Sequence, residues 1–253
     1  MFRPRVIPVL LLKDKGLVKS EKFKNHRYVG DPINAVKIFN DLKADELVFL
    51  DILASTEKRS ISPEFVRRVG DEANMPFAVG GGIRSIKELK ALINAGAEKV
   101  VINTYAVENP AFIKEASEEF GSSTIVVSVD VNQRFLRKQQ VYTAAGTKST
   151  GFSPVEWVQK MQDCGAGEII INSIEHDGTM QGYDWKLVKE VAEAVEIPVV
   201  ALGGAGSLND FTRAVRESYA SAVAAGSLFV FHGPRKAVLV NYPQNKELVH
   251  LFS

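Results

Sequence analysis

The fold is decided by two similar stretches, Ala78-Val79-Gly80-Gly81-Gly82-Ile83 and Val200-Ala201-Leu202-Gly203-Gly204-Ala205-Gly206. Each joins a short apolar run to a cluster of glycines, which is typical of a buried strand that ends in a tight turn. Upstream of each stretch lies a second matching pair, residues 44–52 and 166–174, whose copies are offset by 122 positions. Because this offset is close to half of the 253-residue chain, the sequence predicts a scaffold of two duplicated halves.

Strand-like and helix-like segments alternate along the whole chain. Nearly continuous apolar runs, as expected for strands covered on both faces, occupy residues 5–12, 46–52, 76–79, 99–102, 124–131, 168–172, 199–202 and 222–225. Helices are predicted at residues 32–42, 63–74, 85–95, 110–120, 154–164, 184–194 and 208–218. Three of them begin with a capping side chain before a first-turn proline, at Asp31-Pro32, Ser62-Pro63 and Ser153-Pro154.

The alternation and the duplication together predict one α/β domain over residues 1–253. This domain would be a closed (β/α)₈ TIM barrel, built from half-barrels at about residues 1–122 and 123–253. The length agrees, because such barrels typically span about 250 residues. An open, doubly wound sheet is the structural alternative, but it would not explain the duplication.

The composition is 45% apolar and 24% charged, which is ordinary for a soluble protein with a sizeable core. A formal net charge of +1 gives no reason to expect nucleic acid or an acidic membrane as a partner. Cys164 is the one cysteine, so no internal disulfide can form. No apolar run reaches the roughly 20 residues that cross a bilayer, and the N-terminus lacks a signal-peptide pattern. We therefore expect a cytoplasmic protein.

Two connections are unusually long, residues 13–31 after the first predicted strand and residues 132–152 after the fifth. They occupy equivalent places in the two halves. Both carry many cations, which are Lys13, Lys15, Lys19, Lys22 and Lys24 in the first and Arg134, Arg137, Lys138 and Lys148 in the second. Loops of this length are usually functional or mobile, and in a (β/α)₈ barrel they cover the catalytic face.

Both glycine clusters, Gly80-Gly81-Gly82 and Gly203-Gly204-Ala205-Gly206, end a predicted strand and open a predicted helix. The backbone N–H groups of such glycines can approach a phosphate closely, and the helix N-terminus adds favourable potential. A tight βα turn without a ligand is the simpler interpretation of one cluster. Two clusters at symmetric positions favour a substrate with two phosphates. Asn103-Thr104 and Ala225-Gly226-Ser227, which follow or end two further strands, could complete the two sites.

Asp51, Asp130 and Asp177 each follow an apolar run, which predicts carboxylates at the C-terminal rim of the barrel. A carboxylate there can act as a general acid or base if its surroundings raise its pKa. Asp130 is the sharpest candidate because residues 126–129 place it at the end of a strand, whereas helix capping competes as an explanation for the other two. Lys19 is the cation best placed to close over a bound anion.

Four charged residues begin predicted strands, namely Arg5, Glu46, Lys99 and Glu168. They should converge at the end of the barrel opposite to the phosphate sites. A ring of two cations and two anions can be purely structural, because buried pairs satisfy one another at little net gain. It could instead gate a passage along the barrel axis, and the sequence leaves both alternatives open.

The histidines lack metal-ligand spacing. They are scattered at His26, His176, His232 and His250, with no second histidine within helical or strand reach of His176. We therefore predict no metal site and no cofactor.

The chain resembles the HisF family, the cyclase subunit of imidazole glycerol phosphate synthase, over nearly its whole length. In the first half the matching motifs are Gly30-Asp31-Pro32, Asp45-Glu46-Leu47-Val48-Phe49-Leu50-Asp51-Ile52, Val79-Gly80-Gly81-Gly82-Ile83-Arg84, Lys99-Val100-Val101-Ile102-Asn103-Thr104 and Val107-Glu108-Asn109-Pro110. In the second half they are Gly165-Ala166-Gly167-Glu168-Ile169, Asp177-Gly178-Thr179, Gly182-Tyr183-Asp184 and Gly203-Gly204-Ala205-Gly206. Such dense matching makes the resemblance specific.

The resemblance implies a ribonucleotide substrate with two phosphates and a HisH-like glutaminase docked on the barrel bottom as a heterodimer. Ammonia from that partner would travel through the barrel, and the four-residue charged ring matches the family's ammonia gate. Asp130 matches one of two catalytic aspartates, and Lys19 matches a functional loop position. The phosphate-binding positions implied are Gly81, Gly82, Asn103, Thr104, Asp177, Gly178, Gly203, Gly204, Ala225 and Gly226.

The first strand departs from the family pattern. HisF proteins carry their other catalytic aspartate in a Cys-Leu-Asp-Val-like strand end, whereas this chain reads Ile7-Pro8-Val9-Leu10-Leu11-Leu12, so Leu11 takes that place. Leu11 and Asp130 are offset by 119 positions and end symmetric strands, which supports the alignment. Leucine cannot move a proton, and the loss of one member of an acid/base pair commonly costs several orders of magnitude in rate. Ser123 also replaces the family's usual glutamine near the partner-facing end.

This departure resembles the HisF-like paralogues of acetamidino-sugar biosynthesis, as does the segment Lys13-Asp14-Lys15-Gly16-Leu17-Val18-Lys19. That resemblance implies a role with a HisH-like glutaminase and a separate sugar amidotransferase in surface-polysaccharide or flagellin glycan assembly. We favour this branch over true imidazole glycerol phosphate synthesis, and a non-catalytic ammonia conduit is a further alternative. The isomerase HisA shares the duplicated barrel but needs no ammonia gate, so the charged ring argues against it.

Overall fold

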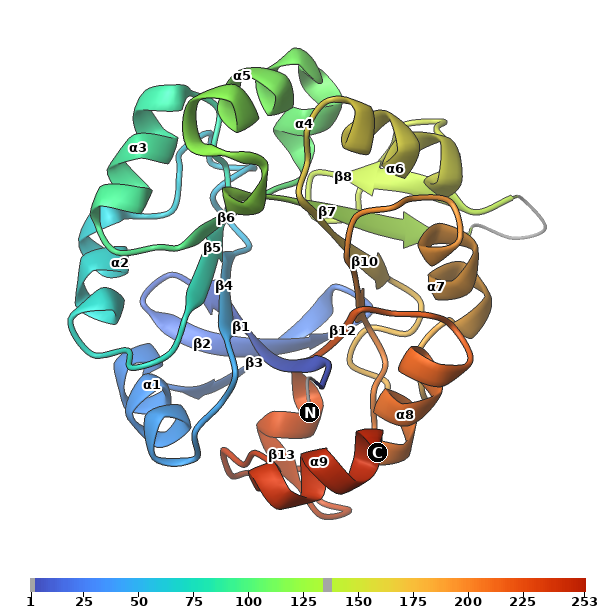
Figure 1. The fold of residues 1–253 in the computed structure, drawn as a ribbon. Coiled ribbons are helices and arrows are strands. Elements are labelled where there is room, and N and C mark those ends of the chain that lie inside the picture. The colour runs from blue at the N-terminus through green and yellow to red at the C-terminus, as the bar shows by residue number, and fades with distance from the viewer. Residues whose placement is uncertain (1–2, 134–137) are drawn as a thin grey trace.

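Eight parallel strands form a closed barrel in the computed structural model (Figure 1). They are β1 (Arg5–Lys13), β4 (Leu47–Asp51), β5 (Phe77–Gly80), β6 (Lys99–Ile102), β7 (Ile125–Asn132), β10 (Glu168–Ser173), β11 (Val199–Leu202) and β12 (Ala222–Ala225). Each strand pairs with the next in this order, and β12 pairs with β1, so the ring closes. The predicted (β/α)₈ barrel is confirmed. The structure describes residues 3–133 and 138–253, so Arg134 and Arg137 lie outside the described residues.

Helices surround the barrel and cover its outer face (Figure 1). They are α1 (Pro32–Asp41), α2 (Pro63–Gly70), α3 (Ile86–Asn94), α4 (Thr104–Glu108), α5 (Ala111–Phe120), α6 (Pro154–Asp163), α7 (Trp185–Ala192), α8 (Leu208–Arg216) and α9 (Asn245–Phe252), with short 3₁₀ turns η1 (Ser122–Thr124) and η2 (Ser227–Phe229). The three predicted caps are confirmed, because Asp31, Ser62 and Ser153 each accept a hydrogen bond from the backbone N–H three residues on. Helix α2 ends at Gly70, earlier than the predicted residue 74, as expected of a poor helix former.

Along each barrel strand, successive side chains alternate between two hydrophobic layers, one outside the barrel and one inside it. On β1, Val6 and Leu10 point outward into the core shared with the helices. Ile7 and Val9 point inward and pack with the inner residues of the other strands. This period-two alternation explains why the strand sequences are apolar throughout, and it fixes which side chains face the barrel axis.

The two long connections contain strands, which the sequence analysis did not predict. The first folds into β2 (Gly16–Glu21) and β3 (Lys24–Gly30), and β2 pairs antiparallel with the end of β1. The second contains β8 (Gln140–Thr143) and β9 (Lys148–Ser149), and β8 pairs with the end of β7. Four consecutive residues of β2, Leu17 to Ser20, are buried, so even a lysine of this hairpin lies in the interior.

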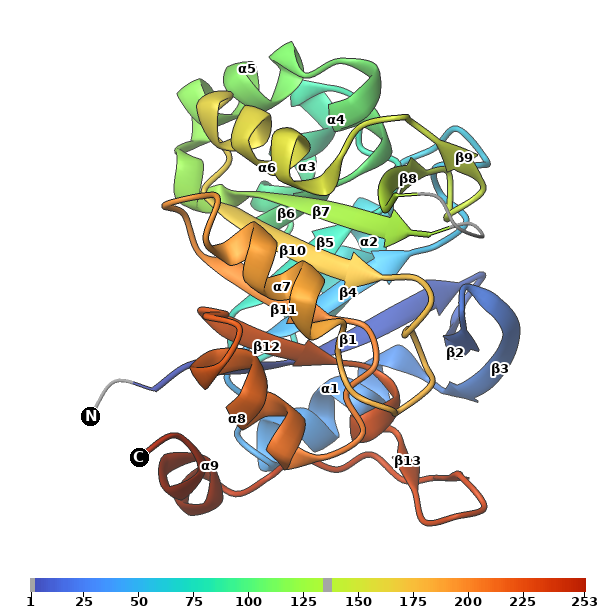
Figure 2. The same cartoon turned by 90° about the vertical axis from the view of Figure 1, so that its right-hand side faces the viewer.

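A side view shows how these hairpins are placed (Figure 2). Both extend from the C-terminal ends of the barrel strands, on the side away from the two chain termini. Within the described residues, no helix has the length and apolar character that a bilayer span requires. The division into half-barrels at residues 122 and 123 stays a prediction.

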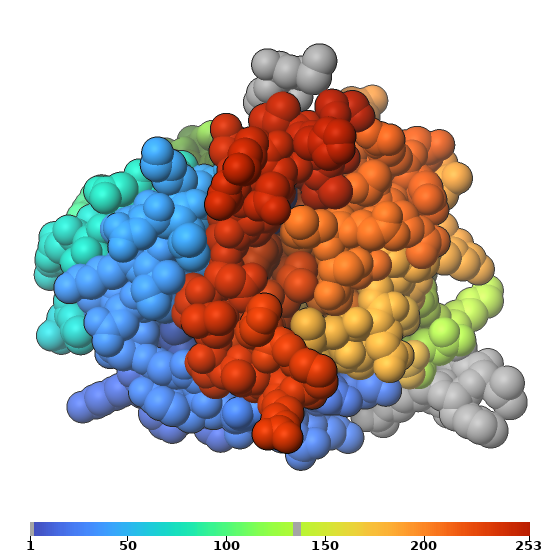
Figure 3. Space-filling view, turned by 90° about the horizontal axis from the view of Figure 1, so that it is seen from below, coloured from blue at the N-terminus to red at the C-terminus, as the bar shows by residue number. Residues whose placement is uncertain are grey.

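The segment after β12 closes the helical layer, and the sequence analysis did not predict its elements. It contains β13 (Phe231–His232), β14 (Ala237–Val238) and α9. Figure 3 shows this red segment lying between the blue N-terminal elements and the orange ones of the second half. The hydroxyl of Tyr242 donates to the carbonyl oxygen of Val6 at 2.9 Å, which ties the segment to β1. The C-terminal segment thereby covers the seam where the barrel closes.

Candidate functional site

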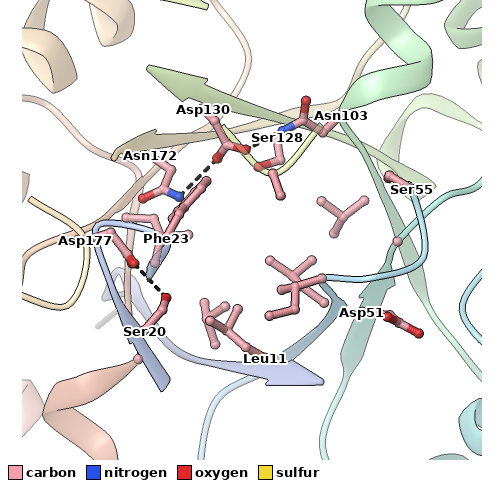
Figure 4. Close-up of a pocket in the computed structure, with 18 of the residues that line it drawn as sticks. Leu11, Ser20, Phe23, Asp51, Ser55, Asn103, Ser128, Asp130, Asn172 and Asp177 are labelled. Atoms are coloured by element: carbon pink, nitrogen blue, oxygen red, sulfur yellow. Dashed lines mark hydrogen bonds between the residues drawn. The ribbon is translucent and has the colours of Figure 1, made fainter. Parts of the chain in front are cut away.

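A cavity of about 270 Å³ opens at the C-terminal ends of the barrel strands (Figure 4). Residues of both glycine clusters line it, as do side chains of the β2–β3 hairpin. The structure brings all the predicted phosphate-binding positions together around this cavity, namely Gly81, Gly82, Asn103, Thr104, Asp177, Gly178, Gly203, Gly204, Ala225 and Gly226. The predicted active-face residues Leu11, Lys19, Asp51 and Asp130 line the same cavity.

The first glycine cluster requires glycine at its centre. Gly81 and Gly82 have φ values of 131° and 65°, in the region that favours glycine. A Cβ atom at Gly82 would collide with the carbonyl oxygen of Arg59. The turn therefore packs tightly against the loop that carries Arg59, at the edge of the cavity.

The second cluster is equally constrained. Gly203 and Gly204 have φ values of 90° and 115°, and a Cβ atom at Gly204 would collide with the carbonyl oxygen of Gly182. Gly178 has a φ of 73° and packs against the backbone of Ser20 in the first hairpin. This packing means that the first hairpin is docked onto the second glycine site.

Asp130 lies at the end of β7, buried at the edge of the cavity. Its two carboxylate oxygens accept hydrogen bonds from the side-chain amides of Asn103, at 2.7 Å, and Asn172, at 3.0 Å (Figure 4). Burial raises the pKa of Asp130 to about 7, although both amide donors oppose the rise. A carboxyl group with this pKa can exchange protons near neutral pH. The sequence analysis did not predict the contact between Asn103 and Asp130.

Asp51 is engaged in a different set of contacts. Its carboxylate forms an ion pair with Arg59 at 2.5 Å, and one of its oxygens accepts from the backbone N–H groups of Leu53 and Ala54 at 3.1 Å each. Figure 4 shows this carboxylate turned away from the centre of the cavity. Asp51 therefore stabilises the loop after β4, and it does not cap the following helix α2, whose N-cap is Ser62.

Lys19 and Asp177 both lie where the first hairpin docks onto the second glycine site. Lys19 lies on strand β2 and not in an open loop, and its buried ammonium donates to the carbonyl oxygen of Val9. Burial lowers the pKa of Lys19 to about 8, opposed by Asp177. Burial also raises the pKa of Asp177, opposed by Lys19 and by a hydrogen bond from Ser20 at 3.2 Å. The Lys19 ammonium lies against Gly226, so the structure places a cation beside the second glycine site.

The opposite wall of the cavity is apolar. Leu11 faces the cavity across from Asp130 (Figure 4). Val9, Leu50 and Ile52 line the same cavity, and Leu202 projects from β11. Among the described residues of β1, no carboxylate faces Asp130, so its surroundings combine amide donors on one side with aliphatic groups on the other.

The four charged residues at the strand starts meet at the other end of the barrel. Arg5 forms ion pairs with both Glu46 and Glu168. Lys99 lies 3.2 Å from Glu46 and 2.8 Å from Glu168, which completes a closed ring. Both glutamates are buried, whereas the Arg5 and Lys99 side chains are 32% and 22% exposed. The ring therefore joins four barrel strands and faces solvent through its cations.

A family model described as Histidine biosynthesis protein matches residues 5–234. The chain belongs to this family. A provisionally named imidazole glycerol phosphate synthase subunit hisF2 from Pseudomonas aeruginosa is 46% identical over 248 residues, covering 98% of this chain and 99% of the relative. A provisionally named subunit HisF from Leptospira interrogans is 42% identical over 253 residues, covering 100% of both. The imidazole glycerol phosphate synthase subunit HisF of Alkaliphilus metalliredigens is 39% identical over 250 residues, covering 99% of this chain and 97% of the relative.

These similarities confirm the resemblance to HisF. In this HisF-family protein the ring and the cavity are separated by an aliphatic inner wall. The wall consists of Ile7, Val9, Val48, Ala78, Val101, Val126, Ile170, Val200, Ala222 and Ala224. Ser128 adds a hydroxyl to this lining directly before the level of Asp130. The barrel interior between the two ends is therefore mostly hydrocarbon.

Three residues that line the cavity were not predicted as site residues by the sequence analysis, namely Asn172, Ser128 and Phe23. Asn172 and Ser128 follow the inward alternation of β10 and β7, which was available as a signal. Phe23 projects into the cavity from the turn of the first hairpin, whose folding was not predicted (Figure 4).

Histidines do not converge in the described part of the chain. There, no group of three or more His, Cys, Asp or Glu side chains is arranged to hold a metal ion. The ring Nδ1 of His176 instead lies 2.9 Å from the carbonyl oxygen of Gly182, in the loop beside the second glycine site.

Proposed function

We propose that this HisF-family protein is the synthase subunit of a glutamine amidotransferase complex. A HisH-like glutaminase would dock on the bottom of the barrel and release ammonia there. The ammonia would pass along the barrel axis to the cavity, where a phosphorylated acceptor binds. The relatives named as subunits of imidazole glycerol phosphate synthase support such a partner.

The observation that carries this proposal is the continuity of three parts along one axis. The charged ring lies at the bottom, the aliphatic wall lies in the middle, and the cavity with its two glycine sites lies at the top. Burying a charge in such a wall is costly, whereas neutral ammonia has no charge to desolvate. An ion pair of the ring must open to admit it, so the ring would act as a gate.

The chemistry at the cavity would depend on Asp130. Its raised pKa suits an acid or base near neutral pH, and the two glycine sites suit an acceptor with two phosphates. Leu11 leaves Asp130 without a partner carboxylate on β1. This difference supports a paralogue that acts in acetamidino-sugar biosynthesis, where ammonia reaches another acceptor or a separate sugar amidotransferase.

A second candidate is the lyase and cyclase reaction of histidine biosynthesis itself. The 39% identity to an imidazole glycerol phosphate synthase subunit favours it, together with the retained Asp130 and Lys19. A conduit without chemistry of its own is the third candidate, favoured by the aliphatic wall around Leu11.

Reconstitution with a HisH-type glutaminase tests the proposal. We expect the purified chain to stimulate glutamate release, and an absence of stimulation would rule out the amidotransferase complex. Turnover of the two-phosphate ribonucleotide with ammonium salts would select the histidine pathway.

Stimulation without that turnover would select the paralogue or the conduit. These two differ in the Asp130→Asn variant, which should abolish product formation by a catalytic paralogue and leave ammonia delivery by a conduit unchanged.

A further inference from the structure

Asp130 and Asn172 face each other on adjacent strands at the rim of the barrel. They are paired in register between β7 and β10, and both are more than nine-tenths buried, at 8% and 5% exposure. The Asn172 amide nitrogen lies 3.0 Å from one carboxylate oxygen of Asp130, and the Asn103 amide nitrogen lies 2.7 Å from the other. The carboxylate is thus held between two strands, β10 and the end of β6.

Asn172 makes this bond at a cost. With its amide nitrogen directed at Asp130, its carbonyl oxygen Oδ1 is buried and has no hydrogen-bond partner among the described residues. That oxygen lies so near Gly203 that a Cβ atom there would be only 2.5 Å away. A buried acceptor without a partner is unfavourable, and such groups in native proteins usually have a functional explanation.

We propose that Asn172 is a positioning residue which, together with Asn103, fixes the carboxylate of Asp130 over the cavity. Each amide donates to a different oxygen, so rotation of the carboxylate would break both hydrogen bonds. The lone pairs not used by the amides remain available to a ligand in the cavity. A leucine of similar size would fill the same space without the unpaired acceptor, so packing alone does not account for asparagine here.

The two amides also select a protonation state. An N–H donor stabilises the ionised carboxylate more than the carboxylic acid. Burial and the negative charge of Asp177 act in the opposite direction, and the balance of these effects sets the pKa of Asp130 near 7. Asn172 therefore favours Asp130 as a proton acceptor, that is, as a general base toward the bound ligand.

The test is a pH titration of the Asp130 carboxyl carbon by ¹³C NMR in the intact protein, with the signal assigned by its absence from the Asp130→Asn variant. In Asn172→Leu we expect the midpoint of the Asp130 titration to rise by about 1 pH unit, which means that Asp130 binds its proton about tenfold more tightly. We also expect the urea midpoint for unfolding to stay the same or increase, because the unpaired oxygen is gone. Asn172→Ala serves as a second variant in case leucine is not accommodated.

Ile171→Val is the matched control, since Ile171 neighbours Asn172 on β10 but points into the outer core. It should lower the urea midpoint and leave the Asp130 titration unchanged. An unchanged Asp130 midpoint in both Asn172 variants would overturn the proposal, as would an equal shift in the control.

The proposal rests on Asp130 as the proton-exchanging carboxylate of the proposed function. The titration requires neither ammonia nor a glutaminase, so its result is separate from the reconstitution. Failed ammonia delivery with a shifted midpoint would reject the proposed function alone, and an unshifted midpoint with intact delivery would reject the role of Asn172 alone.

Discussion

Replacement of Asp130 by asparagine should remove a pH-dependent part of the stability of the fold. Burial raises the pKa of Asp130 to about 7 in the folded protein, whereas an unfolded aspartate titrates near 3.9. The folded state therefore binds this proton more tightly. Its contribution to stability is complete below pH of about 4, is lost as the pH rises through about 7, and is then constant.

The magnitude follows from the difference of about 3 between the two pKa values. At about 1.36 kcal/mol per pKa unit, the full effect is about 4 kcal/mol. Between pH 5 and pH 8 the wild-type protein should lose about 2.5 kcal/mol through this group alone. The asparagine variant has no proton to release at this position, so its loss over the same interval should be smaller by that amount.

Urea unfolding at the two pH values measures the effect, with the slope of free energy against urea held in common. Asp41→Asn is the control, because Asp41 is an exposed carboxylate at the end of α1. It should leave the pH dependence unchanged to within about 0.5 kcal/mol. If Asp130→Asn and the wild type lost the same stability between pH 5 and pH 8, the burial argument for Asp130 would be refuted.

Four further perturbations test other parts of the site. Leu11→Asp places a carboxylate on the wall opposite Asp130. It should raise turnover of the two-phosphate ribonucleotide with ammonium by at least about tenfold, measured by chromatography of the product. No gain would show that the cavity does not fit that acceptor. Glu168→Gln leaves Arg5 and Lys99 with one carboxylate between them, so urea unfolding should report a loss of about 2 kcal/mol after discounting for the exposed cations. An unchanged stability would contradict a stabilising role for these ion pairs. Gly82→Ala should weaken the binding of inorganic phosphate or of the acceptor by about tenfold, measured by calorimetry. The control Gly151→Ala, at a positive φ with open space around it, should lower stability without changing binding. Equal effects of the two variants on binding would argue against the first glycine site. Anion affinity, measured by calorimetry, should fall as the pH rises above about 8, because Lys19 loses its proton there. The Lys19→Met variant should show no such pH dependence. If the variant kept the pH dependence, another group would be responsible for it.

The barrel could be predicted from sequence because its signals are local and repeated. Each apolar run between glycine or proline boundaries is a strand buried on both faces, and the duplication supplies the closure that a single run does not reveal. The hairpin of β2 and β3 could not be predicted in the same way, because Leu17 and Val18 stand among lysines and their burial depends on how β2 pairs with β1 and β3. The C-terminal segment likewise depends on long-range contacts such as that of Tyr242 with Val6.

The sequence was sufficient to predict most residues of the site, but not the hydrogen bonds and ion pairs that they form. Asp130 and the glycines follow from their positions at strand ends. The pairing of Asp130 with Asn172 depends on the register between two strands that are 42 positions apart in sequence, and no local pattern encodes it. Asp51 illustrates the converse, since its place on the rim was predictable while the loop that brings Arg59 to it was not.

The charged ring draws unequally on the two parts of the sequence. Its two carboxylates, Glu46 and Glu168, stand at equivalent positions of the duplicated halves, but both cations, Arg5 and Lys99, come from the first half. At the corresponding strand starts the second half has uncharged residues. Two carboxylates facing each other without cations would repel. Residues 1–122 supply Arg5, Lys99 and Glu46, whereas residues 123–253 supply only Glu168, so the ring needs both parts of the chain.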